Sequence, residues 1–365
     1  MPEPIRVMII DDSSFMRKSL ERMLTADDIH VIGSARDGLD ALEKLPRLKP
    51  DIVTLDVEMP RMDGLTCLKK IMAENPLPVL MVSSLTQEGA KATLDALALG
   101  ALDFISKEKK LGAAGSDIFH IQQELQEKIR KLASSPRFRF RSHRSAQPTT
   151  VARPVISQAP IAPAPKPGAG TIPNIPRADL IVLGCSTGGP KALQDFLPHI
   201  PGKLPVPILI VQHMPSSFTK PFAERLDGIC QLSVKEASHG DIPKPGNVYI
   251  APGGIHMYLR NQLGHHLIEL NPEPSNALHR PSVDVLFESA HDTCNSQIFA
   301  IILTGMGADG AQGMKKLKTK GAYTMVEAES TCVVYGMPKS AFELGCVDVV
   351  APIHDMAGKI GRAHV

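Results

Sequence analysis

The fold of the C-terminal half is indicated by residues 179–191, which read DLIVLGCSTGGPK. The apolar run 180–183 predicts a buried strand, and the spacing of apolar side chains over 193–197 predicts a helix after it. A buried strand that ends at a small residue, presents a hydroxyl and then enters a helix is how α/β enzymes expose a nucleophilic serine. Residues 184–188 fit the pattern G-x-S-x-G, with Ser186 at its centre. A phosphate loop or a simple tight turn can have the same sequence, so this pattern alone leaves those alternatives open.

Apolar runs and helical patterns continue to alternate after this stretch. Alternation at such short spacing is typical of a parallel, doubly wound sheet with helices on both faces. The expected strands of this larger α/β domain, residues 178–360, are 179–183, 206–212, 247–251, 298–303, 322–327 and 347–350.

The N-terminal part, residues 4–134, has the same alternation and predicts a second doubly wound parallel-sheet domain. Its expected strands are 5–10, 31–35, 52–55, 79–82 and 103–105, and its expected helices are 14–25, 38–45, 63–74, 88–99 and 116–133. Periodicity is lost between the two domains, over residues 135–177, where arginines are followed by a tract rich in proline and alanine. We expect this segment to be an extended, proline-stiffened linker, with an arginine docking patch as the alternative.

Composition limits the classes of function. The formal net charge is only +2 and Trp is absent, which argues against a nucleic-acid surface. The six cysteines form no C-x-x-C pair, so we expect reduced and mostly buried thiols. No leader-like segment and no apolar run of about 18 residues occurs, which predicts a cytoplasmic protein without membrane insertion.

Four strand ends of the first domain carry five residues that suit a phosphorylation site. Asp11 and Asp12 follow the first strand, Asp56 ends the third, Ser83 closes the fourth and Lys107 follows the fifth. The carboxyl ends of parallel strands meet at one edge of the sheet, so these side chains should converge there. Clustered carboxylates need a hard cation such as Mg²⁺, and the lysine can pair with phosphoryl oxygens.

Residues 5–130 resemble a two-component response-regulator receiver domain. The resemblance implies that Asp56 is the phospho-acceptor, that Asp11 and Asp12 bind the metal and that the backbone carbonyl of Glu58 completes the metal site. It also implies a switch pair and a characteristic loop after the acceptor, which are here Ser83, Phe104 and residues 59–64. Glu108 departs from the pattern, because the family usually has proline after the lysine.

A serine–histidine–aspartate set can be assembled in the second domain. Ser186, His213 and Asp309 each follow an expected strand, so all three fall at one edge of the sheet. Serine is a weak nucleophile that needs an imidazole to take its proton, and a carboxylate fixes the imidazole tautomer. Each member has a rival: Cys185 as nucleophile, His256 as base or pocket residue, and Asp284 as acid or helix cap.

Two other functions compete for the second domain. Residues 305–310 form a literal G-x-G-x-x-G after a strand, and Glu327 closes the next strand, as in a dinucleotide-binding site. However, Asp309 lies inside that turn, where its charge would oppose a pyrophosphate. A helix-turn-helix DNA-binding domain does not fit about 170 residues of alternating strands and helices.

The second domain also resembles the catalytic domain of the chemotaxis protein-glutamate methylesterase family, CheB. The resemblance implies a phosphorylation-regulated enzyme that removes methyl groups from glutamate methyl esters of chemoreceptor signalling domains, releases methanol and deamidates receptor glutamines. It implies an oxyanion site near Thr187 and Met306, no cofactor for the esterase reaction, a chemotaxis histidine kinase as phosphodonor and a monomeric protein. The matching segments are 186–189, 212–214, 251–253, 256–257, 280–284 and 303–310.

Overall fold

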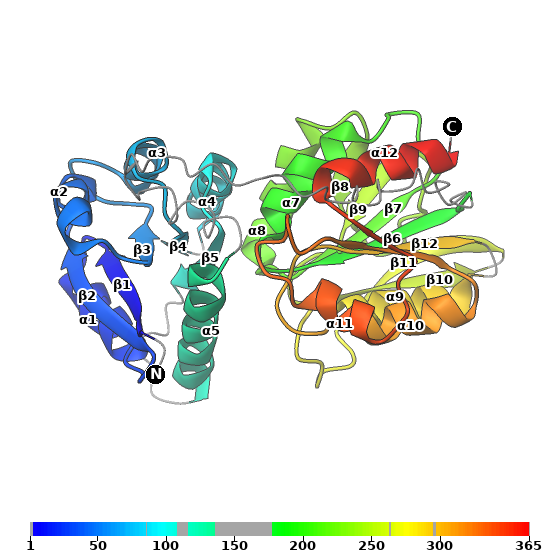
Figure 1. Cartoon of the computed structure of the whole chain (residues 1–365). Helices are drawn as coiled ribbons and strands as arrows, with labels where there is room; N and C mark the ends of the chain where they lie inside the picture. The colour runs from blue at the N-terminus through cyan, green and yellow to red at the C-terminus, as the bar shows by residue number, and fades with distance from the viewer. Residues whose placement is uncertain are drawn as a thin grey trace, which may run out of the picture.

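The computed structural model describes residues 3–84, 86–107, 116–135, 177–262, 264–294 and 297–364. It contains two α/β domains, each built on a parallel sheet (Figure 1). The fold class predicted from the sequence is therefore confirmed. Most of the expected linker, residues 136–176, and Glu108 lie outside the described residues. No helix in the described ranges combines the length and apolar character that a membrane crossing requires.

The first domain has a five-stranded sheet in the order β2-β1-β3-β4-β5, with every pair parallel. Its apolar strands are buried because helices cover both faces: α2, α3 and α4 pack on one face, and α1 and α5 on the other. The elements are β1 (Ile5–Ile10), α1 (Ser14–Met23), β2 (Ile29–Ala35), α2 (Gly38–Leu48), β3 (Ile52–Asp56), α3 (Gly64–Glu74), β4 (Val79–Ser84), α4 (Gln87–Leu99), β5 (Asp103–Lys107) and α5 (Ser116–Ala133).

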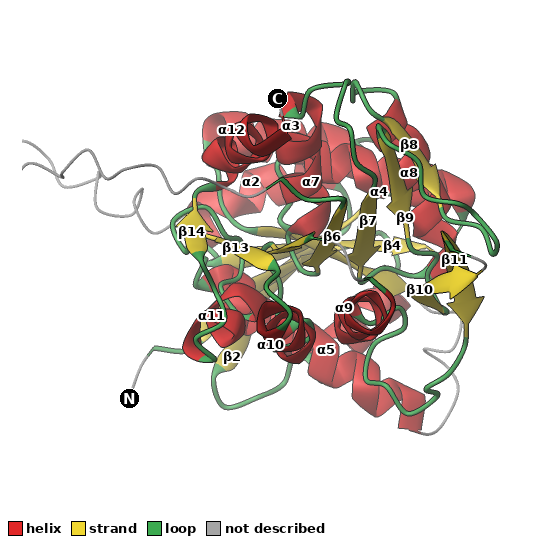
Figure 2. Cartoon of the chain, turned by 90° about the vertical axis from the view of Figure 1, so that its right-hand side faces the viewer, coloured by secondary structure: helices red, strands yellow, loops and turns green. Residues whose placement is uncertain are grey.

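The second domain has a seven-stranded parallel sheet in the order β14-β13-β12-β6-β7-β9-β8. Figure 2 shows α7, α8 and α12 on one face of this sheet and α9, α10 and α11 on the other. The elements are β6 (Leu180–Cys185), α7 (Gly189–Phe196), η1 (Leu197–His199), β7 (Ile208–Gln212), α8 (Ser216–Asp227), β8 (Ser233–Glu236), β9 (Asn247–Ile250), β10 (His256–Gln262), β11 (His265–Asn271), α9 (Val283–Thr293), β12 (Ile298–Ile302), α10 (Ala311–Thr319), β13 (Tyr323–Glu327), α11 (Met337–Glu343), β14 (Val349–Ala351) and α12 (Ile353–His364).

Three strands of this domain were absent from the expectation. Strand β8 has the sequence SVKE and lies at the edge of the sheet, so it lacks the continuous apolar run of a central strand. Strands β10 and β11 form a separate antiparallel hairpin whose side chains are partly exposed. Except for the short edge strand β14, the expected strands are the buried ones, because parallel strands covered on both faces are apolar throughout.

The two domains meet through α4 of the first and α7 and α8 of the second. Phe104 on β5 stacks on Phe218 of α8, with ring centroids 4.5 Å apart and an angle of 19° between the rings. Beside this stack, Asp95 on α4 pairs with Arg225 on α8. The side chain expected to report phosphorylation is therefore in direct contact with the second domain.

Candidate functional site

The turn after β6 holds Ser186 at the edge of the sheet. Its backbone N–H donates to the carbonyl of Thr304 over 3.0 Å, and its own carbonyl accepts from Gly189 and from the Gln212 side chain. The turn continues through Gly188 at φ 79, a left-handed conformation that glycine adopts without strain. The half-buried serine is thus presented between β6 and the start of α7, as the sequence pattern predicts.

The loop after β12, residues 303–310, passes directly beside this serine. A Cβ placed on Gly305 would lie 2.9 Å from the Cβ of Ser186, which is too close for any larger residue without movement. The same loop carries Asp309, so the approach that requires glycine also brings the carboxylate to the serine's edge of the sheet.

His213 and Asp309 form a hydrogen bond. The Nε2 of His213 lies 2.8 Å from Oδ2 of Asp309, and both side chains are largely buried. The other ring nitrogen, Nδ1, is buried and has no hydrogen-bond partner in the described part of the chain. Because an imidazole needs one nitrogen for its orienting carboxylate and one for the nucleophile's proton, Nδ1 is the nitrogen available for proton transfer.

Asp309 lies at the amino end of α9. Oδ2 also accepts from the backbone N–H of Val283 over 2.7 Å. Oδ1 accepts from the Ser282 hydroxyl over 2.8 Å and from the backbone N–H of Asp284 over 2.9 Å. Burial alone would raise the pKa of this carboxyl, but the hydrogen bond and charge of His213 together with the backbone N–H groups hold the pKa well below its usual range. The acid therefore stays charged beside the imidazole.

The sequence analysis did not identify His279, which stacks on His213. The ring centroids are 4.2 Å apart and the rings are inclined by 25°. Burial, followed by the repulsion of His213, lowers the pKa of His279 to about 4, so its ring is neutral near pH 7. The only sequence signal was its position immediately before the matched segment 280–284.

The rival residues have other roles in the structure. Cys185 is fully buried, with its sulfur 3.1 Å from Oε1 of Gln212, and burial raises the pKa of its thiol well above the usual value. His256 is also fully buried; its Nδ1 accepts from the backbone N–H of Ser282 over 3.2 Å, and Nε2 lies 3.3 Å from the carbonyl of Pro274. Both ring nitrogens of His256 are thus occupied, and the ring supports the serine that donates to Asp309.

Asp284 is not the N-cap of its own helix, which was one of the two alternative roles considered for it. Ser282 is the N-cap of α9, with its hydroxyl accepting from Val285. Asp284 instead accepts from the backbone N–H of Gly313 over 2.6 Å, at the amino end of α10. Burial raises the pKa of Asp284 to about 6. Each carboxylate thus accepts from the amino end of the other's helix. Asp309 precedes α10 and caps α9, while Asp284 lies in α9 and caps α10.

In the alternative of a dinucleotide site, Glu327 would be the acid that binds the ribose, but the structure gives this side chain another partner. Glu327 is buried, and its Oε2 accepts from the backbone N–H of Thr304 over 2.9 Å. This oxygen is therefore engaged by the turn after β12 and is not free for a ribose hydroxyl. The loop 305–310 instead passes beside Ser186 at Gly305 and carries Asp309, which is hydrogen-bonded to His213.

The predicted phosphorylation residues of the first domain also converge. Ligand atoms of Asp11, Asp12 and Asp56 lie within 4.8 Å of one another. Lys107 bridges two of them, with Nζ 2.8 Å from Asp11 and 2.7 Å from Asp56. Burial raises the pKa of Asp56 to about 6, against the opposing effect of Lys107. Three carboxylates at one edge are a donor set that fits Mg²⁺, and Glu58 follows Asp56 by two residues.

The two predicted switch residues, Ser83 and Phe104, lie between this edge and the second domain. Ser83 is buried one strand away from Asp56, and its hydroxyl donates to the carbonyl of Gly89 over 3.2 Å, at the start of α4. Phe104 is the residue stacked on Phe218. The path from the acceptor aspartate to the domain interface therefore consists of adjacent strands and one helix start.

A second contact between the domains lies beside the loop 303–310, which passes next to Ser186. A cavity of about 530 Å³ is bounded by Lys131 of α5, by Ser134 just after this helix and by the loop at Met306 and Gly307. Val333 and Val334 of the second domain, with Met306 against them, join the apolar cluster that includes the buried face of α5. The first domain is therefore packed against the loop that carries a predicted oxyanion residue.

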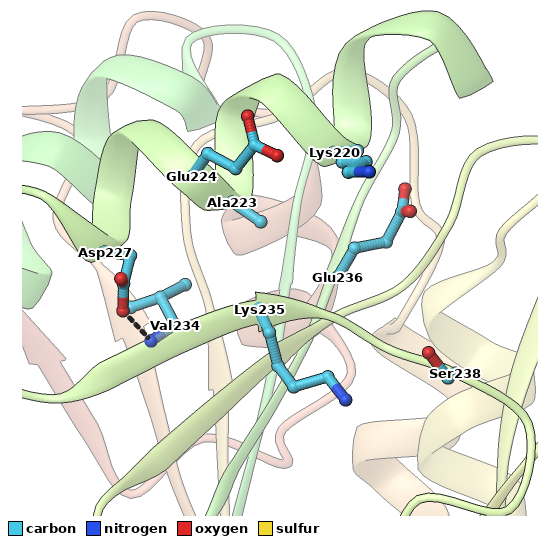
Figure 3. Close-up of a pocket in the computed structure, with 8 residues that line it drawn as sticks. All are labelled: Lys220, Ala223, Glu224, Asp227, Val234, Lys235, Glu236 and Ser238. Carbon is cyan, nitrogen blue, oxygen red and sulfur yellow. Dashed lines mark hydrogen bonds between the residues drawn. The ribbon is translucent and has the colours of Figure 1, made fainter.

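Another hollow, of about 380 Å³, lies between α8 and β8 (Figure 3). Three of its charged side chains already have partners: Asp227 accepts from the backbone N–H of Val234, Lys235 pairs with Asp241, and Glu236 accepts from Thr219. Its lining includes none of Ser186, His213 and Asp309, and we assign it no role.

Comparisons with known proteins identify the family of both domains. A family model described as CheB methylesterase matches residues 181–360, and one described as response regulator receiver domain matches residues 7–113. The protein-glutamate methylesterase/protein-glutamine glutaminase 1 of Oleidesulfovibrio alaskensis is 48% identical over 98% of this chain and 99% of that protein. The chain belongs to the CheB methylesterase family.

Other members of the family are similarly close. The protein-glutamate methylesterase/protein-glutamine glutaminase of Halalkalibacterium halodurans is 44% identical over 99% of both chains. Among solved structures, the CheB methylesterase catalytic domain of Thermotoga maritima is 44% identical, covering 50% of this chain and 97% of that one, with a TM-score of 0.49.

Proposed function

We propose that this chain is a phosphorylation-regulated protein-glutamate methylesterase and protein-glutamine glutaminase that acts on the cytoplasmic signalling domains of chemoreceptors. The observation that carries the proposal is the hydrogen bond between His213 and the charged Asp309 at the edge where the turn presents Ser186. The proposal is supported by relatives named for these activities, which are 44–48% identical to this chain over nearly its whole length. The protein acts in the cytoplasm as a monomer.

The reaction follows from the roles of the three side chains. Ser186 attacks the ester carbonyl while Nδ1 of His213 takes its proton, and Asp309 stabilises the imidazolium through Nε2. The tetrahedral intermediate expels methanol, which receives the proton from His213, and leaves a glutamyl-serine ester. Water then attacks this ester by the same route and releases the glutamate carboxylate. A glutamine side chain enters the same cycle with ammonia as the leaving group. No cofactor takes part in these steps.

The oxyanion is held by backbone N–H groups of Thr187 and Met306. In the part of the chain that the structure describes, neither N–H donates to another protein group. Two free donors on the turn and on the adjacent loop match the requirement for stabilising a developing negative charge. His256 contributes by supporting Ser282, and not as the base.

The first domain regulates this reaction through phosphorylation of Asp56 by the chemotaxis histidine kinase. Asp11, Asp12, Asp56 and the carbonyl of Glu58 would hold Mg²⁺, which neutralises phosphoryl charge when bound. Lys107 pairs with the phosphoryl oxygens. Ser83 and Phe104 then transmit the change to the interface with the second domain.

The unphosphorylated first domain restrains the enzyme, because it packs against α8 and against the loop at Met306. A fragment that begins near Pro173 should therefore exceed the unphosphorylated full-length protein in activity, and a phosphodonor should raise full-length activity. Asp56→Asn should abolish the response to phosphodonor and keep basal turnover. A fragment less active than the full-length protein would contradict this sign of regulation.

The test of the function itself is methanol release from radiolabelled, methylated receptor membranes, with and without a phosphodonor. Wild-type protein should release methanol, and Ser186→Ala should lower turnover by several orders of magnitude. Near-normal release by Ser186→Ala would reject the assigned nucleophile, and no release by the wild type would reject the function.

A further inference from the structure

One large apolar side chain is almost fully exposed beside the catalytic histidine. Leu278 is 91% exposed, whereas the next most exposed large hydrophobic residue among those described, Phe15, is 61% exposed. It directly precedes His279, whose ring stacks on His213 at 4.2 Å. Adjacent Cα atoms are about 3.8 Å apart, so Leu278 lies at the rim of the serine site.

The segment that carries Leu278, residues 272–281, is held in place by its own hydrogen bonds. The backbone N–H of Ala277 donates to the carbonyl of Pro274 over 3.2 Å, and the Arg280 guanidinium donates to the carbonyl of Ser275 over 3.1 Å. The carbonyl of Arg280 in turn accepts from Gly254 over 3.0 Å. The leucine is therefore displayed on a segment tied at both ends to the site, and not on an isolated chain.

We propose that Leu278 is a specificity-determining residue that contacts the receptor helix carrying the methyl ester. This inference rests on the proposed function, and it identifies how that site recognises a protein substrate. Ser186, His213 and Asp309 lie near the surface, so an ester on a short glutamyl side chain can reach Ser186 only if its helix lies across the rim. The full-length chain leaves Leu278 uncovered, so the contact is available while the first domain is docked.

The chemistry of leucine defines what the contact can do. A leucine side chain has no hydrogen-bonding group, so it recognises alkyl or apolar surface on the helix and not the ester itself. A small soluble ester can enter the site without this contact. The leucine should therefore affect KM for a receptor substrate and leave the reaction of a small ester unchanged.

The experiment compares two substrates with full-length protein treated with acetyl phosphate. Methanol release is measured from methylated receptor membranes and from N-acetyl-glutamate γ-methyl ester, each over a range of concentrations. Leu278→Ala should raise KM for the receptor about tenfold with little change in kcat, and should match wild type on the small ester. Leu278→Met keeps an apolar side chain and should restore most of the receptor affinity.

Ile242→Ala is the matched control. Ile242 is an aliphatic residue that is 54% exposed, and it precedes the amino end of β9, whereas the serine site is at the carboxyl ends of the strands. Its removal should change neither reaction. An unchanged receptor KM in Leu278→Ala overturns the inference, and so does an equal loss on both substrates, which would assign the residue a structural role. Failure of wild-type protein on both substrates would instead reject the proposed function.

Discussion

Replacing Asp309 by asparagine tests the electrostatic basis of the catalytic set. Each carboxylate oxygen of Asp309 accepts from two donors: Oδ2 from His213 and Val283, and Oδ1 from Ser282 and Asp284. An asparagine has one acceptor oxygen and one NH₂ group, so one of these pairs must face an N–H donor. Whichever way the amide turns, the two hydrogen bonds accepted by one of the two carboxylate oxygens are lost.

The expected magnitude follows from the two possible orientations. With NH₂ toward His213, Nε2 must accept, the ring proton moves to Nδ1, and His213 can no longer take the proton of Ser186. With oxygen toward His213, the tautomer survives but the imidazolium loses its counter-charge. The same aspartate-to-asparagine change in serine proteases lowers kcat by about 10⁴, which corresponds to roughly 5 kcal/mol of transition-state stabilisation. We therefore expect kcat to fall by about 10³ to 10⁴ in Asp309→Asn. The unpaired donor at α9 should also cost about 1–3 kcal/mol of stability.

The assay is methanol release from methylated receptor membranes, combined with thermal unfolding of the same samples. Asp284→Asn is the matched control, because it makes the same chemical change one residue into α9 and keeps an oxygen for the N–H of Gly313. It should retain activity. Activity of Asp309→Asn within tenfold of wild type would refute the role of Asp309, and equal losses in both variants would show that helix capping, and not charge at His213, explains the effect.

Three further outcomes are expected. Cys185→Ala should retain activity within a few-fold, and the wild type should resist inactivation by iodoacetamide, since the Cys185 thiol is buried with a raised pKa; loss of turnover in the variant, or inactivation of the wild type that Cys185→Ala abolishes, would support a thiol nucleophile. The melting temperature of the wild type should fall as pH rises from about 4 to about 6. The pKa of Asp284 is raised to about 6 in the folded protein, so over this range the unfolded protein releases the Asp284 proton at lower pH than the folded protein does. Asp284→Asn should lessen this fall, and an unchanged slope of melting temperature against pH would show that Asp284 does not cause it. Arg225→Ala, which breaks the partly buried pair with Asp95, should raise the activity of the unphosphorylated full-length protein by up to about fivefold and leave the fragment that begins near Pro173 unchanged. An effect on the fragment would exclude release of the first domain as the cause.

Much of the fold could be predicted because the central strands are buried on both faces. Strands such as β6 and β12 are continuous apolar runs, and their carboxyl ends had to meet at one edge. That rule placed the candidate acid, base and nucleophile together without any knowledge of distances. The edge strand β8 and the hairpin β10–β11 lack this signal, because exposed positions accept polar residues.

The finer features of the site depend on contacts between segments distant in sequence. Which nitrogen of His213 faces the acid, and the stacking of His279 upon it, are fixed by packing of the segment before α9. The exchange of caps by Asp284 and Asp309 depends on the relative position of two helices. A sequence pattern shows only that an acid lies near a helix start, and it cannot show which helix the acid caps.

The two contacts made by the first domain differ in what they can transmit. Phe104 is on the strand next to Ser83, close to the acceptor edge, so its stack on Phe218 is placed to respond to a charge at Asp56. The contact of α5 with Val333 and Val334 lies beside the loop 303–310, where it can restrain Met306. Because both contacts belong to one rigid parallel-sheet domain, loosening the first also weakens the second. We therefore expect regulation to act by releasing the domain as a body, with Phe104 sensing the phosphate and α5 controlling access to the oxyanion loop.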